Sequence, residues 1–178
     1  MRRLILLRHA KTESDAPTGR DQDRRLDERG RNDAAEIGEW IGRHPPFPDA
    51  VLVSPAVRAR ETWDIAWQAM REQVREPRVQ EVPAIYAAEP GDLLTVIRTA
   101  TIPDNPERLM LVGHNPGMHE LALMLSNGSG GAAAQALQDN LPTSGLAIFD
   151  FDIRDWSDIG YRRGQLVLFV SPKSLRRS

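Results

Sequence analysis

The segment MRRLILLRHAKTE, residues 1–13, decides the fold and raises the question of function. Leu4 to Leu7 form a short, continuous apolar run, which is typical of a parallel strand that is buried on both faces. Arg8 and His9 follow this run directly. Packing alone does not require a cationic and a titratable side chain at the end of a buried strand, so we expect both residues to serve a site.

The rest of the chain alternates between similar apolar runs and stretches in which apolar residues recur at helical spacing. Further strands are predicted at residues 50–53, 79–82, 109–112, 146–151 and 166–170. Helices are predicted at residues 27–44, 56–71, 92–99 and 117–126. The polar, charge-dense residues 13–25 are expected to form a surface loop. Strands that alternate with helices predict a three-layer α/β/α fold, in which helices flank a mainly parallel sheet.

The composition narrows the class of protein. The 178 residues are expected to form a single domain, residues 1–178. Hydrophobic residues make up 40% and charged residues 27%, and 23 basic against 25 acidic residues give a formal net charge of −2. This balance is ordinary for soluble proteins and does not favour a nucleic acid as partner. The absence of cysteine excludes a disulfide framework, a thiolate metal site and a thiol nucleophile.

The start of the chain does not have the pattern of a targeting segment. Arg2 and Arg3 resemble the basic start of a secretory signal, but the apolar run ends at Leu7, which is shorter than the ~7–15 residues of a signal core. No stretch approaches the ~20 apolar residues of a membrane span. We therefore expect a cytoplasmic protein that does not bind membranes.

The carboxyl ends of three predicted strands gather basic residues at one edge of the sheet, where ligands bind in open α/β folds. Arg8 and His9 end the first strand. Arg58 lies in the first turn of the helix after the second strand, and His114 comes shortly after the fourth. Two arginines and two histidines repel one another unless an anion is bound. Because the planar guanidinium matches phosphate oxygens, we expect the ligand to be a phosphoryl group.

Two predicted helix starts at the same edge offer further donors. Ser54–Pro55 and Asn115–Pro116 each precede a predicted helix, and free amides at a helix start favour an anion. Ser54 is also expected to cap its helix, with Pro55 at the first helical position.

The predicted surroundings of His9 suit nucleophilic attack on phosphorus. Neighbouring arginines disfavour the protonated imidazole, so the neutral form should be held at physiological pH. Attack by His9 would form a phosphohistidine, while Arg8, Arg58 and His114 stabilise the charge on the equatorial oxygens. Water would then release phosphate.

Three segments resemble the signature stretches of the histidine phosphatase superfamily, which has the phosphoglycerate-mutase-like fold. They are LRHAKTE (7–13), SPAVRARET (54–62) and VGHNPG (112–117). RHAKTE and RDQDRRLDERGRNDA (20–34) are similar to the small SixA-type phosphohistidine phosphatases. LPTSGLAIF (141–149) gives weaker support.

The resemblance implies a role for each matching residue. His9 would be the nucleophile, Arg8 and Arg58 would bind phosphate, and His114 would stabilise the transferring group. It implies no metal and no cofactor, and it implies a hydrolase that takes part in signal transduction.

The sequence departs from the pattern of the superfamily at two places. Ala10 replaces the glycine that usually follows the histidine, which adds a methyl group and would disfavour a left-handed backbone there. The segment IYAAEPGD (85–92) offers Glu89 or Asp92 as general acid, without a clear motif. The imidazole of a free histidine side chain has a pKa of about 6.5 and departs more easily than an alkoxide. A phosphohistidine substrate therefore needs less help from an acid.

The favoured hypothesis is therefore a phosphatase that acts on a phosphorylated protein, at phosphohistidine. A phosphatase for small phosphate monoesters is the first alternative, since an open site without a long lid admits both kinds of substrate. A non-catalytic phosphate-binding module is the second alternative. A metal site built on His9, His114 and His119 is a third idea, but these residues lack a recognisable ligand spacing.

Overall fold

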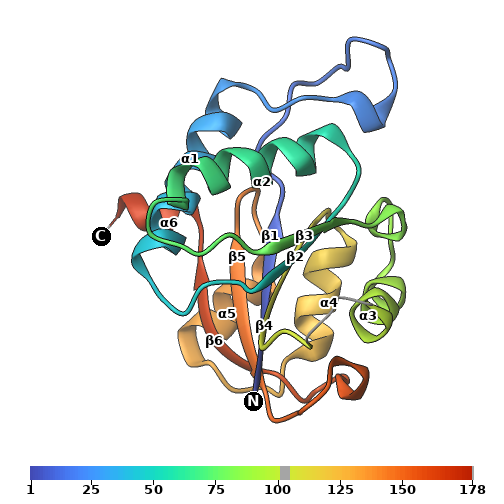
Figure 1. The fold of residues 1–178 in the computed structure, drawn as a ribbon, viewed down its shortest axis with the longest axis vertical. Helices are drawn as coiled ribbons and strands as arrows, with labels where there is room; N and C mark the ends of the chain where they lie inside the picture. Colours follow the sequence, from blue (N-terminus) through green and yellow to red (C-terminus); the bar gives the residue numbers. More distant parts are fainter. Residues whose placement is uncertain (101–104, 178) are drawn as a thin grey trace.

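The computed structural model describes residues 1–100 and 105–177. The sheet that these residues form is mixed, with strand order β3-β2-β4-β1-β5-β6 (Figure 1). Its strands are β1 (Arg2–Arg8), β2 (Ala50–Val53), β3 (Arg78–Glu81), β4 (Arg108–Gly113), β5 (Leu146–Phe151) and β6 (Gln165–Val170). The pairs β1–β4, β2–β4 and β2–β3 are parallel, whereas β5 is antiparallel to both of its neighbours, β1 and β6. The predicted mainly parallel sheet is confirmed.

Helices cover both faces of this sheet. They are α1 (Glu28–Arg43), α2 (Val57–Met70), α3 (Pro90–Thr99), α4 (Gly117–Leu125), α5 (Gly131–Asp139) and α6 (Pro172–Arg176). Helices α1, α2 and α6 pack on one face, and α3, α4 and α5 pack on the other (Figure 1). Three short 3-10 helices lie at Asp21–Asp23, Pro83–Ile85 and Trp156–Asp158. The three-layer α/β/α prediction is therefore confirmed.

The apolar run in β1 shows why the pattern does not alternate. Leu4 and Leu6 belong to the core on the α3–α5 side, and Ile5 and Leu7 belong to the core on the α1–α2 side. All four side chains are at most 3% exposed. Burial stabilises each by about 1.5–3 kcal/mol, so β1 is the central support of the sheet edge where it ends.

Helix α1 is fixed at its start against the segment that follows β1. The Asp27 carboxylate accepts a hydrogen bond from the Gly30 amide (2.7 Å), which is the predicted N-cap. A Cβ atom at Gly30 would clash with the carbonyl oxygen of Lys11. The absence of a side chain at Gly30 thus lets α1 approach the loop after His9.

The boundaries of the predicted elements agree with the structure to within two residues. Helices α5 and α6 and the three 3-10 helices were not predicted. Helix α2 begins at Val57, and its N-cap position is Ala56, without a side-chain cap, so Ser54 is not the cap and Pro55 is not at the first helical position. None of the described helices is long and apolar enough to cross a membrane.

Candidate active site

The parallel strands β1, β2 and β4 end at the same edge of the sheet, and the four residues singled out in the sequence meet there. Arg8 is the last residue of β1, and the amide of His9 donates to the carbonyl of Gly113 at the end of β4 (3.1 Å). The rings of His9 and His114 lie with their centroids 5.2 Å apart. Arg58, in the first turn of α2, lines one pocket together with His114. The structure thus brings together side chains that are up to 106 positions apart (8 to 114) in the sequence.

The ring of His9 has a defined tautomer. Its Nδ1 atom lies 2.7 Å from the carbonyl oxygen of Ala10, and because a carbonyl only accepts, Nδ1 carries the proton. Burial, followed by the nearby guanidinium groups of Arg58 and Arg8, lowers the pKa of His9 to about 4. The imidazole is therefore neutral near pH 7, with its free lone pair on Nε2.

His114 is held by the residue that follows β2. Its Nε2 atom lies 2.7 Å from the Ser54 hydroxyl, which also accepts from the Ala56 amide (3.2 Å). Burial, followed by the charges of His9 and Arg58, lowers the pKa of His114 to about 3. Ser54 therefore serves a histidine rather than a helix start, because this tertiary contact replaces the local capping role.

Both arginines are anchored at their terminal nitrogens. Arg8 donates from Nη1 to the carbonyl of Leu141 (3.1 Å), and Arg58 donates to the backbone carbonyl (2.8 Å) and carboxylate (3.0 Å) of Asp21. Buried atoms without a hydrogen-bond partner among the described residues remain at Arg8 Nε, Arg58 Nε and His114 Nδ1. An unsatisfied buried polar atom costs about 1–3 kcal/mol, and an oxyanion with several acceptor oxygens is the ligand that suits such a group.

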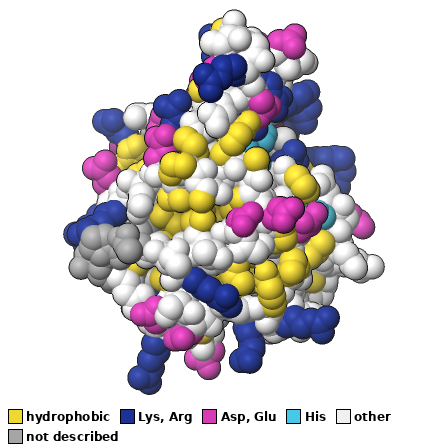
Figure 2. All heavy atoms as spheres, turned by 90° about the vertical axis from the view of Figure 1, so that its right-hand side faces the viewer, with side chains coloured by type: hydrophobic (Ala, Val, Ile, Leu, Met, Phe, Trp, Pro, Cys, Tyr) yellow, Lys and Arg dark blue, Asp and Glu magenta, His cyan; other side chains and the backbone are white. Residues whose placement is uncertain are grey.

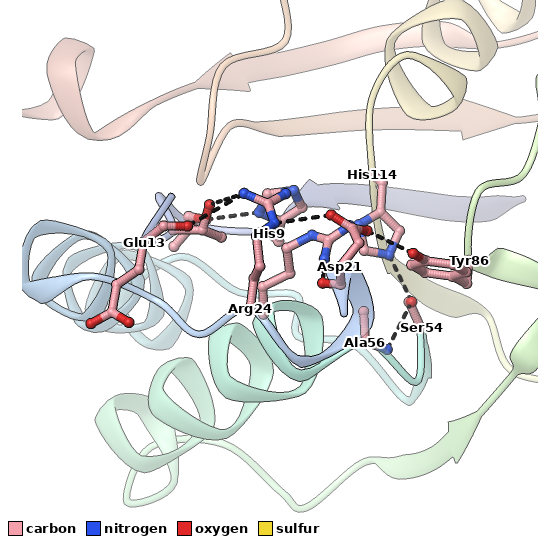
Figure 3. A network of polar contacts seen from close by, with 11 residues as sticks. His9, Glu13, Asp21, Arg24, Ser54, Ala56, Tyr86 and His114 are labelled. Carbon is pink, nitrogen blue, oxygen red and sulfur yellow. Dashed lines mark hydrogen bonds and ion pairs between the residues drawn. The ribbon is translucent and has the colours of Figure 1, made fainter. Parts of the chain in front are cut away.

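Three residues that the sequence did not single out complete the network around Arg58 (Figure 3). The carboxylate of Asp21 accepts from the hydroxyl of Tyr86 (2.6 Å) and from Nε of Arg24 (2.9 Å), in addition to Arg58. The Tyr86 hydroxyl and then Arg58 hold the pKa of Asp21 down, at about 2. None of residues 13–25 is buried, which confirms the predicted surface loop, but the loop also crosses to the site, where Asp21 pairs with Arg58. The dense charge of DQDRR (21–25) was the only feature of the sequence that pointed to this network.

Thr62 connects the segment after the histidine to helix α2. Its hydroxyl accepts from the amide of Ala10 (2.9 Å) and donates to the carbonyl of Arg58 (2.7 Å). Ala10 is fully buried against Leu26 and Ala34, and its φ is not among the positive ones. The backbone at Ala10 is therefore not left-handed, and the methyl group is tolerated.

The two candidates for a general acid have different positions. Glu89 is exposed and lines the pocket that Arg58 and His114 also line. Asp92 accepts a hydrogen bond from the Glu89 amide (3.1 Å) and lines a separate cavity on the other side of α3. Of the two, only Glu89 borders the site.

The start of α4 does not supply the free amides that were expected there. The Met118 amide donates to the carbonyl of His114 (2.9 Å), and the His119 amide donates to the side chain of Asn115 (3.2 Å). The ring of His119 interacts through Nε2 with the carbonyl of Leu137 (2.6 Å), so this histidine ties α4 to α5. Among the described residues, no group of three or more histidine or acidic side chains is placed to hold a metal.

Comparison with known proteins agrees with this geometry. The family model of the histidine phosphatase superfamily (branch 1) matches residues 4–84. An uncharacterised protein of Mycobacterium tuberculosis is 35% identical over 170 residues, which cover 94% of this chain and all of that protein.

Two solved structures share the fold over nearly the whole chain. A protein of Agrobacterium tumefaciens, provisionally named phosphohistidine phosphatase SixA, is 32% identical with a TM-score of 0.76, covering 96% of this chain and 98% of that one. A protein of Nakamurella multipartitia with the same provisional name is 24% identical with a TM-score of 0.80, covering 96% of both chains. The chain therefore belongs to the histidine phosphatase superfamily, in its SixA-type branch, and is a phosphatase.

Proposed function

We propose that this phosphatase removes the phosphoryl group from phosphohistidine on a protein, through a covalent intermediate on His9. The observation that carries the proposal is the hydrogen bond of His9 Nδ1 to the Ala10 carbonyl, which leaves Nε2 unprotonated. The lowered pKa of His9 keeps this nitrogen free well below pH 7. A fixed, neutral imidazole beside two arginines is the group that phosphoryl transfer requires.

The first step transfers the phosphoryl group to the enzyme. The substrate ring first takes a proton from solvent on the nitrogen that does not carry phosphorus. The Nε2 lone pair of His9 then forms a bond to phosphorus while the P–N bond of the substrate breaks, and the ring leaves as neutral imidazole. In this step the Nε atoms of Arg8 and Arg58, which have no hydrogen-bond partner among the described residues, would bind the equatorial oxygens. Positioning and electrostatic stabilisation supply most of the catalysis in such transfers.

The second step returns the enzyme to its starting state. A water molecule attacks phosphorus, the bond to His9 Nε2 breaks, and the water proton passes to solvent as inorganic phosphate leaves. When the Ser54 hydroxyl donates its hydrogen bond to Nε2 of His114, the ring proton of the neutral His114 lies on Nδ1. Nδ1 would then donate a hydrogen bond to a phosphoryl oxygen in both steps.

The proposed leaving group reduces the need for a general acid. Asp92 lies in another cavity, and Glu89 is an exposed residue at the border of the pocket. A phosphohistidine ring that is protonated on its other nitrogen leaves as neutral imidazole, whose pKa is near neutrality (about 6.5), so it needs no acid at the scissile nitrogen, unlike an alkoxide.

A phosphohistidine substrate is supported by the relative from Agrobacterium tumefaciens, whose provisional name is that of a phosphohistidine phosphatase. A phosphatase for small phosphate monoesters is the second candidate. The pocket beside Arg58 has a volume of about 670 Å³, which lies within the ~300–1,000 Å³ of small-molecule sites. A non-catalytic binding module is disfavoured by the intact His9 and by the family.

A comparison of turnover on three substrates tests the proposal. A phosphohistidine protein, a phosphoserine peptide and an aryl phosphate are offered at matched concentrations, with the His9→Ala variant as control. We expect kcat/KM to be at least about tenfold higher for the phosphohistidine protein than for the serine ester, because its leaving group is better. Equal or lower activity on the phosphohistidine protein would contradict the proposal and favour small esters.

A further inference from the structure

The pocket next to the four basic residues has an unexpected charge. Three carboxylates line it, those of Asp21, Glu89 and Glu120, against the single guanidinium of Arg58. His114 adds no positive charge at neutral pH, because burial lowers its pKa to about 3. The wall of this pocket, which contains Arg58 and His114 of the four basic residues, is thus more negative than positive.

The pairing of Asp21 with Arg58 leaves two carboxylates without compensation. Asp21 and Arg58 form an ion pair at 3.0 Å. No ion pair within the described part of the chain involves Glu89 or Glu120. Two carboxylates without an ion-pair partner at this place weaken the binding of a phosphate dianion and favour a cationic group beside it.

Burial separates the pocket into an inner and an outer part. Arg58 and His114 are 5% and 8% exposed, and each has a buried polar atom without a partner among the described residues. Glu89, just before α3, and Glu120, on α4, are exposed. Acidic side chains form a row across this face of the molecule, with hydrophobic side chains around them (Figure 2). If Arg58 and His114 bind the phosphoryl group, the substrate segment that bears this group lies near the carboxylates of Glu89 and Glu120.

We infer that Glu89 and Glu120 form an acidic rim that selects substrate proteins with lysine or arginine next to the phosphohistidine. This inference rests on the proposed function and adds the charge of the substrate segment to it. Exposed ion pairs are individually weak, so the rim should change kcat/KM by about threefold to tenfold in total. The preference should fade as salt shortens the Debye length from about 10 Å at 0.1 M to about 3 Å at 1 M.

Peptides with identical cores test the rim. One phosphohistidine peptide has two flanking lysines, and the other has two flanking glutamates. The wild-type protein should show the higher kcat/KM with the lysine peptide at low salt. The E89Q/E120Q variant should lose most of this preference.

A matched variant controls for net charge. Glu39, on α1, and Glu72, just after α2, are exposed and do not line the pocket, so E39Q/E72Q removes the same charge elsewhere. This control should keep the wild-type preference. If E39Q/E72Q lowers the preference as much as E89Q/E120Q, the rim is wrong and only the overall charge matters.

Two phosphotyrosine peptides, one with two flanking lysines and one with two flanking glutamates, test the rim independently of the proposed function. Cleavage of both phosphohistidine peptides at equal rates overturns the rim and leaves the proposed function standing. If neither phosphohistidine peptide is cleaved, a lysine preference on the phosphotyrosine peptides that is lost in E89Q/E120Q supports the rim and overturns the phosphohistidine proposal. No preference with either phosphoryl linkage, or a glutamate preference, overturns the rim.

Discussion

Nδ1 of His9 lies 2.7 Å from the carbonyl oxygen of the next residue, Ala10. This contact between two consecutive residues sets the tautomer of the ring, because the carbonyl oxygen accepts a hydrogen bond from the protonated Nδ1. The nucleophilic nitrogen is therefore prepared before any substrate binds. The backbone of Ala10 is itself fixed by Thr62, so the orientation of the ring depends on α2 as well as on β1.

The pH dependence of kcat/KM should follow the lowered pKa of His9. Burial and nearby guanidinium groups place this pKa at about 4. Since kcat/KM reports the free enzyme, the nucleophile should stay neutral as the pH falls and be lost only near pH 4. The profile is measured with an aryl phosphate and corrected for the ionisation of the substrate. An acidic limb centred near 6.5 would show that the histidine is not buried among cations as described.

Removal of the Thr62 hydroxyl should damage both stability and activity. The Thr62→Val variant loses the bonds to the Ala10 amide and the Arg58 carbonyl. An unsatisfied buried amide costs about 1–3 kcal/mol, which urea unfolding should show, and kcat should fall because His9 and Arg58 are no longer linked. Thr62→Ser keeps the hydroxyl and should remain close to wild type. Equal losses in both variants would point to packing of the methyl group instead.

The contact between Ser54 and His114 should affect catalysis more than binding. Ser54→Ala removes the hydroxyl that lies 2.7 Å from His114 Nε2. A hydrogen bond of this kind is worth about 0.5–1.5 kcal/mol, so kcat should fall about threefold to tenfold while KM stays nearly constant. Steady-state kinetics on an aryl phosphate provide the test. A change confined to KM would assign His114 to ground-state binding alone.

Asp21 should compete with phosphate for Arg58. In Asp21→Asn the carboxylate that accepts from Arg58 is replaced by a neutral amide, so inorganic phosphate should inhibit several-fold more strongly at low salt. Asp23→Asn is the matched control, because Asp23 accepts from Thr18 and does not contact Arg58. Weaker inhibition by phosphate in Asp21→Asn would mean that Asp21 positions Arg58 rather than competes with phosphate.

The main strands and the positions of Arg8, His9, Arg58 and His114 could be predicted because both depend on local pattern. Continuous apolar runs between turns indicate buried strands, and parallel strands bring their carboxyl ends to one edge. The helix-capping rule predicted Asp27 correctly. It was wrong for Ser54, whose partner His114 is distant in sequence.

Other features depend on the path of the chain and have no local signal. Asp21 and Tyr86 meet across 65 positions, and neither lies at the end of a predicted strand. Helix α5 was not predicted because it buries only Leu137 and follows a glycine-rich segment, so it lacks a clear apolar stripe. Thr62 lies inside helix α2, and the reach of its hydroxyl to the segment after β1 has no local sequence signal.

A trapped phosphoenzyme tests the central claim most directly. The protein is mixed with excess phosphohistidine protein and quenched within milliseconds in alkali, in which phosphohistidine survives, and the attachment site is located by mass spectrometry. We predict one phosphoryl group on His9 that forms and decays at the rate of turnover, and a loss of about a thousandfold or more in kcat for His9→Ala. Turnover without any phosphoryl group on His9, or undiminished turnover by His9→Ala, would contradict the account.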